Sequence, residues 1–152
     1  MKIKKILCAV DFSEYSEQAL KYAAFLSRSH GAKLILLHVI EPLHGSEQYM
    51  VLALTPLEIK VKLKDEANNQ LSALANNVKS STKVETAVRE GKAFVEIIKK
   101  AKEDRVDLIV MGSHGRTGLE HILIGSVAEK VTPKASCPVL IVKGKDTKFK
   151  MP

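Results

Sequence analysis

Five short apolar runs divide the chain into strand-like segments, and each run is separated from the next by a segment with helical spacing. The runs occupy residues 4–10, 33–39, 83–88, 106–111 and 138–142. Strands that alternate with helices predict βαβ units and a parallel sheet. We therefore expect a single-domain, Rossmann-like α/β fold, a doubly wound five-stranded parallel sheet with helices on both faces.

Capping signals mark the ends of the first two helices. Ser13 begins the first helix, and Gly31 ends it because glycine readily adopts the left-handed conformation of a helix stop. Thr55 and Glu58 form a capping box, with Pro56 in the first turn, and open the second helix. The apolar stripe predicted for this second helix consists of Leu57, Val61, Leu71, Leu74, Ala75 and Val78.

A long loop and a third helix are predicted on either side of the third run. Residues 41–54 show no clear period and contain Pro42 and Gly45, so we expect a loop of the kind that is often functional. After Gly91 the residues Phe94 and Ile97 share the apolar face of the third predicted helix.

A glycine-spaced loop follows the fourth run. Two residues separate Gly112 from Gly115, Gly118 follows, and nine residues separate Gly115 from Gly125 and Ser126. An apolar strand that opens into such a loop and then into a helix start is typical of phosphate-binding sites. Glycine has no side chain, so backbone N–H groups can approach the anion closely.

The helix after this loop is predicted from Ser126 and Glu129, which form a capping-box pattern, and Pro133 is expected to end it. Without a ligand, the glycines would serve only a tight turn with positive φ, and Ser126 would only cap its helix. The full spacing favours phosphate binding over these structural interpretations.

The glycine spacing resembles the ATP-binding signature of the universal stress protein family. The resemblance covers nearly the whole chain and includes residues 6–13, 34–39 and 136–142. It implies the strand order 3-2-1-4-5, which makes the first and fourth strands neighbours. Ligands of such sheets bind where the topology reverses, outside the carboxyl ends of the strands. Asp11 and Gly112 would converge there.

The same resemblance implies roles for individual residues. Asp11 would hydrogen-bond the nucleoside, unless it only caps the first helix, and the backbone of Val39 would meet the adenine edge. Arg116 would either contact phosphate or be a solvated loop residue. The ligand is expected to be ATP, with Mg²⁺ carried by its phosphates, and AMP or ADP are alternatives. The predicted phosphate-binding residues are Gly112, Gly115, Gly125, Ser126 and Val127.

The predicted function is that of an ATP-binding universal stress protein, a nucleotide-dependent sensor or switch with slow hydrolysis at most. A nucleotide hydrolase with genuine turnover and a nucleotide-independent interaction scaffold remain as alternatives. His38 is interpreted as a core histidine, and His114 lies in the glycine loop without a catalytic triad or a metal-ligand cluster. The Walker A pattern is absent, so strong ATP hydrolysis is not predicted.

Composition limits the partners of the chain. Its formal net charge is +7, but lysines are dispersed among acids and only 5% of residues are aromatic, which argues against nucleic-acid binding. No apolar run approaches the roughly 20 residues that a membrane helix needs. Cys8 and Cys137 are interpreted as buried small hydrophobes. We expect a cytoplasmic protein.

The fifth strand, which begins at Pro138 and ends at Val142, is strongly apolar yet would lie at the sheet edge. An exposed apolar edge is normally covered or paired, so we expect a homodimer through this strand, as family members commonly form. Residues 4–144 are the expected universal stress protein domain, and residues 145–152 a flexible basic tail. In the alternative, residues 143–150 cover this edge in a monomer. A further protein partner, of unknown identity, is also expected.

Overall fold

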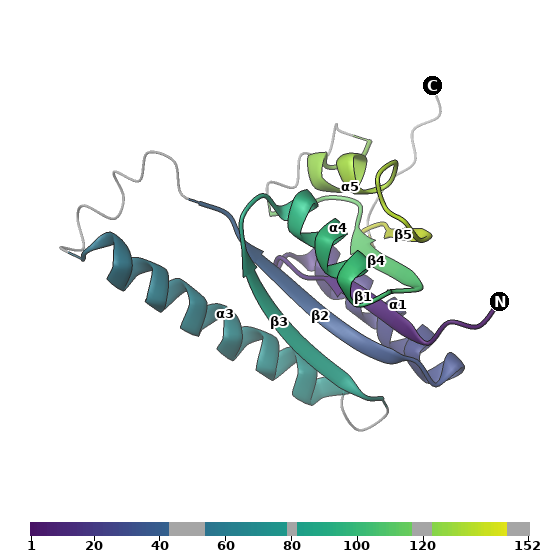
Figure 1. The fold of residues 1–152 in the computed structure, drawn as a ribbon. Helices are drawn as coiled ribbons and strands as arrows, with labels where there is room; N and C mark the ends of the chain where they lie inside the picture. The colour runs from purple at the N-terminus through teal and green to yellow at the C-terminus, as the bar shows by residue number, and fades with distance from the viewer. Residues whose placement is uncertain (43–53, 79–81, 117–122, 146–152) are drawn as a thin grey trace.

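The computed structural model, which describes residues 1–42, 54–78, 82–116 and 123–145, has one five-stranded sheet in the order β3-β2-β1-β4-β5 (Figure 1). All neighbouring strands pair in parallel, so the predicted fold and strand order are confirmed. The strands are β1 (Lys5–Ala9), β2 (Lys33–Ile40), β3 (Val84–Glu90), β4 (Leu108–Gly112) and β5 (Val139–Val142). The helices are α1 (Glu14–His30), α3 (Pro56–Val78), α4 (Ala93–Glu103) and α5 (Ser126–Val131).

Two hydrophobic layers hold the helices against the sheet. Because side chains alternate along a strand, Ile6 and Cys8 of β1 face the layer that contains buried residues of α1 and α3. Leu7 faces the opposite layer, which contains buried residues of α4 and α5. Alternate strand residues are therefore buried on both faces, as the nearly unbroken apolar runs predict.

The carboxyl ends of the strands are staggered at the switch in strand order. β1 ends at Ala9, which pairs with Leu37, whereas β2 continues to Ile40. On the other side of β1, Cys8 pairs with Val110, and β4 also continues beyond that pair. The early end of the central strand therefore leaves room between β2 and β4.

The predicted caps of α1 and α3 are present. Ser13 is the N-cap of α1 and accepts a hydrogen bond from the Ser16 N–H, and Gly31 ends the helix with φ of 62°. Thr55 N–H donates to Glu58 Oε2 at 2.7 Å, and Glu58 N–H donates to Thr55 Oγ1 at 3.3 Å. This reciprocal pair is the capping box that the sequence predicts.

Three sequence predictions need correction. Gly125, not Ser126, is the N-cap of α5, because Gly125 is extended and Ser126 is already helical; no side chain caps this helix. α5 ends at Val131, ahead of Pro133 as expected. Cys8 is fully buried, but Cys137 is only partly buried because it lies in the loop before β5.

The third correction concerns α3. Leu57 and Val61 are 70% and 52% exposed, whereas Leu71 and Ala75 are buried. A helix of 23 residues is about 34 Å long, while the seven residues of β3 span about 23 Å, so the N-terminal part of α3 extends beyond the strand. The predicted apolar stripe is thus buried only in its C-terminal part.

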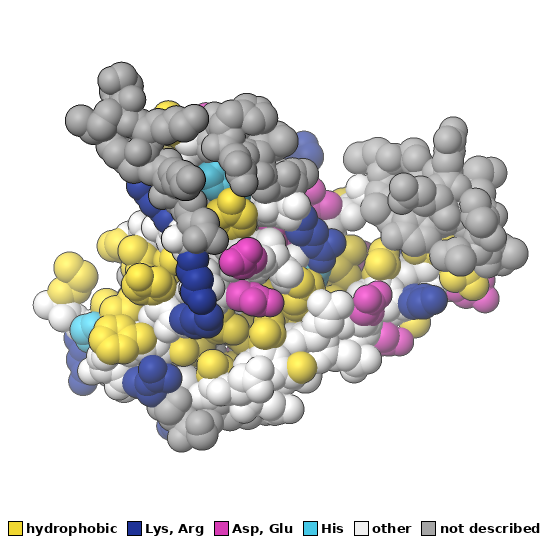
Figure 2. All heavy atoms as spheres, turned by 180° about the vertical axis from the view of Figure 1, so that it is seen from behind, with side chains coloured by type: hydrophobic (Ala, Val, Ile, Leu, Met, Phe, Trp, Pro, Cys, Tyr) yellow, Lys and Arg dark blue, Asp and Glu magenta, His cyan; other side chains and the backbone are white. Residues whose placement is uncertain are grey.

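The predictions for Gly45, Gly118 and most of the C-terminal tail concern positions outside the described residues. On the face that Figure 2 shows, lysine and arginine side chains occur in separate places among acidic and apolar ones. None of the described helices combines the length and apolar character required to cross a bilayer.

Candidate functional site

A cleft of about 710 Å³ opens at the carboxyl ends of β1, β2 and β4, where the strand order reverses. Small-molecule sites commonly have volumes of about 300–1,000 Å³. The residues that the sequence predicts for a ligand site all line this cleft: Asp11, Val39, Gly112, Gly115, Arg116, Gly125, Ser126 and Val127. The fold thus brings together residues from four separate segments of the chain.

Asp11 lies in the turn that joins β1 to α1. Its Oδ1 accepts hydrogen bonds from the N–H and the hydroxyl of Ser13. Ser13, not Asp11, caps the helix, so the interpretation of Asp11 as an N-cap is wrong. The two bonds on Oδ1 fix the carboxylate, and its Oδ2 points toward Gly115, where a Cβ atom would come within 2.9 Å of it.

Phe12, which sequence analysis did not single out, adopts an unusual backbone conformation in this turn. Its φ is 64°, which costs a bulky residue on the order of 1–3 kcal/mol. Its ring lies 4.5 Å from the His38 ring, and the Arg116 guanidinium carbon lies 6.0 Å from its centroid. The strained turn is therefore supported by contacts with β2 and with the glycine loop.

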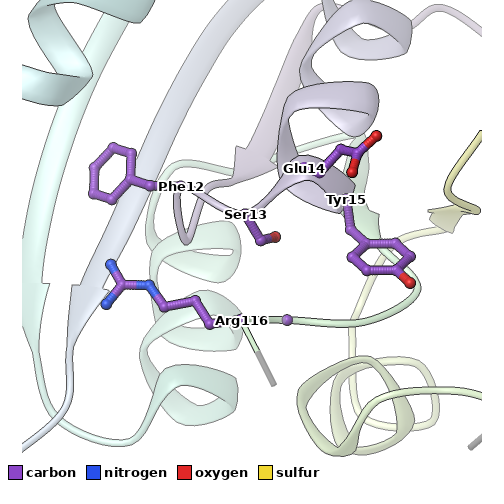
Figure 3. Close-up of a pocket in the computed structure, with 6 residues that line it drawn as sticks. Phe12, Ser13, Glu14, Tyr15 and Arg116 are labelled. Atoms are coloured by element: carbon purple, nitrogen blue, oxygen red, sulfur yellow. The ribbon is translucent and has the colours of Figure 1, made fainter. Parts of the chain in front are cut away.

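Arg116 connects the glycine loop to the same turn. Its Nε donates to the Asp11 carbonyl oxygen at 2.7 Å, which ties this exposed side chain to the turn. Figure 3 shows Phe12 and Arg116 projecting to one side of the turn and Tyr15 to the other. These residues also line a second hollow of about 460 Å³ beside Ser13 and Gly115.

The glycines of the loop permit close approach between backbone segments. A Cβ atom on Gly112 would lie 2.8 Å from Tyr15 Cβ, and one on Gly125 would lie 3.1 Å from His114 Cα. Among the glycines that the structure describes, positive φ occurs at Gly31 and Gly91, so the alternative of a tight turn with positive φ is wrong for Gly112, Gly115 and Gly125. Glycine is needed because β4 and its loop pack directly against the start of α1.

Backbone hydrogen bonds hold the two ends of the glycine loop together. Gly125 N–H donates to the Ser113 carbonyl at 2.6 Å, and Ser113 N–H donates to the Val142 carbonyl at 2.8 Å. The first turn of α5 is thereby fixed beside the end of β4. The N–H groups of Ser126 and Val127 belong to that turn, where a helix offers its own N–H groups no acceptor.

Val39 directs its backbone toward the cleft. The Leu37 carbonyl accepts from Val10 N–H on the β1 side, whereas the Ile40 carbonyl accepts from Gly91 N–H on the β3 side. Because these directions alternate along a parallel strand, the N–H and C=O of Val39 face the β1 side, beyond the end of β1. Its side chain packs in the layer beneath α4.

The wall of the cleft opposite the glycine loop comes from α3, a helix that sequence analysis did not assign to a site. Its residues Leu63, Ala67 and Gln70 lie on one helical face and line the cleft, together with Glu66. Glu41, at the end of β2, also lines the cleft and accepts a hydrogen bond from Ala93 N–H at 2.8 Å. The carboxylates of Glu41 and Glu66 thus lie on this side, and Asp11 and Arg116 lie on the other. The helical spacing of Leu63, Ala67 and Gln70 could have indicated this face, but the apolar stripe of α3 was interpreted only as a contribution to the hydrophobic core.

The two histidines near the cleft differ in their surroundings. His38 is 8% exposed and its Nδ1 lies 2.7 Å from the Val10 carbonyl oxygen, which confirms a hydrogen-bonded, buried histidine. Burial lowers its pKa below the ordinary value of 6.5. His114 Nδ1 lies 2.9 Å from Ser113 Oγ, and its ring lies 5.1 Å from that of Tyr15. Within the described ranges, no three His, Cys, Asp or Glu side chains form a metal-ligand group.

An open α/β sheet with a cleft at its topological switch point defines a class of ligand-binding protein. Within that class, the chain belongs to the universal stress protein family, which it matches over residues 2–143.

Individual relatives agree over nearly their full length. The chain is 37% identical to universal stress protein MJ0577 of Methanocaldococcus jannaschii, over 95% of this chain and 97% of that protein. It is 33% identical to universal stress protein YxiE of Bacillus subtilis, over 91% of this chain and 98% of that protein. The solved structure of MJ0577 has a TM-score of 0.83 at 38% identity and covers 96% of this chain and 99% of its own.

Proposed function

We propose that this protein binds an adenine nucleotide, with ATP as the expected ligand, and acts as a nucleotide-dependent switch in a stress response. The observation that carries the proposal is the convergence of the eight predicted residues on one cleft at the switch point. These residues are far apart in sequence, yet the fold makes them neighbours. If each had only a structural role, they would not need to meet in one cleft.

The charges of the cleft suggest how the nucleotide lies. Arg116 and the N–H groups of the loop favour phosphate at one end. Glu41 and Glu66 would repel phosphate at the other end, where the nucleoside fits better. The adjacent N–H and C=O of Val39 suit an adenine edge, which offers a ring-nitrogen acceptor beside an amino donor. Guanine presents the reverse pattern at that edge, so we expect ATP to bind more tightly than GTP.

The remaining roles follow from this orientation. The Asp11 carboxylate would accept a hydrogen bond from a ribose hydroxyl, because its Oδ2 is directed into the cleft near Gly115. Backbone N–H groups of Gly115, Ser126 and Val127 would donate to phosphate oxygens. Mg²⁺ would be held mainly by the phosphates and by water.

Two solved structures of this fold contain nucleotides. A universal stress protein in complex with cAMP has a TM-score of 0.71 at 23% identity, covering 93% of this chain and 98% of its own. An Arabidopsis thaliana family member with AMP bound has a TM-score of 0.63 at 19% identity, covering 97% and 96%. They support a nucleotide as the ligand class, and AMP and ADP therefore belong in every binding assay beside ATP.

We further propose that ATP acts by linking the β1 turn to the glycine loop, which would alter a surface that another protein recognises. Hydrolysis is expected to be slow at most. Sustained turnover, well above one equivalent per protein, would favour the hydrolase alternative. Binding of a protein partner without any nucleotide would favour the scaffold alternative. A cytoplasmic location is part of the same proposal.

The direct test is to identify the nucleotide that copurifies with the protein. After denaturation, mass spectrometry of the released small molecules should show ATP or its breakdown products. Calorimetry on protein stripped of nucleotide should then give saturable binding of ATP with Mg²⁺. Absence of both results would refute nucleotide binding.

We also propose a homodimer through the strand that begins at Pro138 and ends at Val142. Carbonyls of Pro138 and Val142 accept hydrogen bonds from the β4 side. By alternation, the N–H and C=O groups of Val139 and Ile141 point away from the sheet. Antiparallel pairing with the same strand of a second copy would satisfy them by two-fold symmetry.

A further inference from the structure

His38 lies in the wall of the cleft with one ring nitrogen engaged. Its Nδ1 contacts the Val10 carbonyl oxygen, which can only accept a hydrogen bond. Nδ1 must therefore carry the hydrogen, and the lone pair of the neutral ring is on Nε2.

Nε2 is open to the cleft. Within the part of the chain that the structure describes, every buried side-chain nitrogen and oxygen has a hydrogen-bond partner. His38 makes its hydrogen bond through Nδ1, and Nε2 makes none to another described residue. Since every buried side-chain nitrogen has a partner, Nε2 is not buried. Because His38 lines the cleft, a proton can reach Nε2 from the cleft while the bond to Val10 stays intact.

The ring also supports the turn that carries Asp11. Phe12 has a φ of 64°, and its ring packs 4.5 Å from the His38 ring. Phe12 also meets the Arg116 guanidinium, whose Nε is bonded to the Asp11 carbonyl at 2.7 Å. Val10 and Phe12 flank Asp11 in sequence, so His38 contacts the residue on each side of it.

Resting on the nucleotide-binding function proposed above, we propose that His38 is a positioning residue for the cleft. In its neutral form it holds the Val10 carbonyl and the Phe12 ring, and through them keeps Asp11 and Arg116 where the nucleotide meets them. Protonation of Nε2 leaves the bond to Val10 in place but puts a second positive charge near Arg116, which weakens the support of the Phe12 turn and therefore the binding of the nucleotide.

The charges around the ring favour its neutral form. Burial lowers the pKa of His38 most; the bond to Val10 opposes this, Arg116 lowers the pKa further, and Asp11 raises it. The other titratable groups lining the cleft are Glu41, Glu66 and His114. A protonated ring would place a second cation against Phe12, which the Arg116 guanidinium also meets. Moving either cation away removes support from the Phe12 turn.

The test compares ATP affinity at about pH 7.5 and about pH 5.5, on either side of the ordinary histidine value. Calorimetry with Mg²⁺-ATP is run on the wild type, His38→Asn and His38→Phe, with His30→Asn as a control at the exposed end of α1. Asparagine can donate to Val10 as Nδ1 does, but it does not titrate; phenylalanine cannot donate. Protonation of ATP itself is common to all four proteins.

Wild type and His30→Asn should lose about three- to fivefold in affinity at the lower pH if binding lowers the pKa of His38 by one unit, because the full factor of ten is reached only at a pH below both the free and the bound value. His38→Asn should lose less than about 1.5-fold, and near neutral pH it should recover most of the affinity that His38→Phe lacks. Thermal melts without nucleotide identify any variant that fails to fold. In the wild type, NMR should show that ATP lowers the pKa of the His38 ring, by reciprocal linkage.

The outcomes separate the two proposals. A folded wild type that binds no nucleotide at either pH refutes the proposed function, and this inference with it. A wild type that binds ATP but shares the pH profile of His38→Asn, or binds more tightly in acid, refutes the positioning role alone. An NMR titration of His38 that ATP leaves unchanged does the same, even if neither variant folds.

Discussion

Replacing Gly115 with alanine should damage the nucleotide site while leaving most of the fold intact. The new Cβ would lie 2.9 Å from Asp11 Oδ2, whereas ordinary contacts of this kind begin near 3.4 Å. One of the two groups must therefore move by about half an ångström. Asp11 cannot swing freely, because its Oδ1 holds the N–H and hydroxyl of Ser13. The movement either breaks those bonds or displaces the loop.

The size of the effect follows from the bond at risk. A hydrogen bond to a charged group is worth about 1.5–3 kcal/mol. At about 1.4 kcal/mol for each factor of ten, losing the contact between Asp11 and the nucleotide should weaken ATP binding by about 10- to 100-fold. Gly115→Val adds two further methyl groups and should abolish measurable binding. Overpacking should also reduce the free energy of unfolding by about 1–3 kcal/mol.

Calorimetry with Mg²⁺-ATP measures the affinity, and a thermal melt without nucleotide measures stability. If Gly115→Ala acts through Asp11, it should weaken binding by no more than about twofold in an Asp11→Ala background. Gly31→Ala is the matched control: its φ is 62°, nothing lies within 4 Å of its Cβ position, and it lies at the far end of α1. That variant should lose about 1 kcal/mol of stability and no affinity. A folded Gly115→Ala protein that binds ATP like the wild type would refute the reasoning.

Three further predictions concern the whole protein. ATP at about 100 times its Kd should stabilise the protein by about 2.7 kcal/mol, and GTP by less; melting curves of nucleotide-free protein that ATP leaves unchanged would contradict this. The Lys4 and Lys5 N–H groups hold the pKa of Asp107 below its ordinary value of 3.8, so the stability that this carboxylate contributes is complete above that value and lost as pH falls below it. Asp107→Asn should cost about 1 kcal/mol near neutral pH, and denaturant titrations should show a smaller loss of stability in acid than in the wild type. Ile141→Pro removes an outward N–H and should give monomers by light scattering, whereas Ile141→Ala, which keeps that N–H, should remain dimeric; a monomeric wild type at micromolar concentration would exclude the dimer.

The elements and their order along the chain follow directly from the sequence, because they depend on local physics. Ser13, Gly31 and the pair of Thr55 and Glu58 act within one helical turn, and the structure confirms each of them. Ser126 was misplaced by one residue, because the choice between N-cap and first helical position depends on backbone conformation at Gly125. The spacing of Gly112 and Gly115 marks them as site residues, but it does not show which contacts require glycine at these two positions.

That reason exists only in three dimensions. The order β3-β2-β1-β4-β5, which here came from family resemblance, places the end of β4 against the start of α1, so that Gly112 meets Tyr15 and Gly115 meets Asp11. The left-handed Phe12, its ring contact with His38 and the hydrogen bond from Arg116 to Asp11 likewise join residues from three separate parts of the chain. Hydrophobic periodicity and caps report what a residue does to its near neighbours in sequence. The chemistry of a cleft depends on contacts between distant residues, and these are set by how the strands pair and how the helices pack on them.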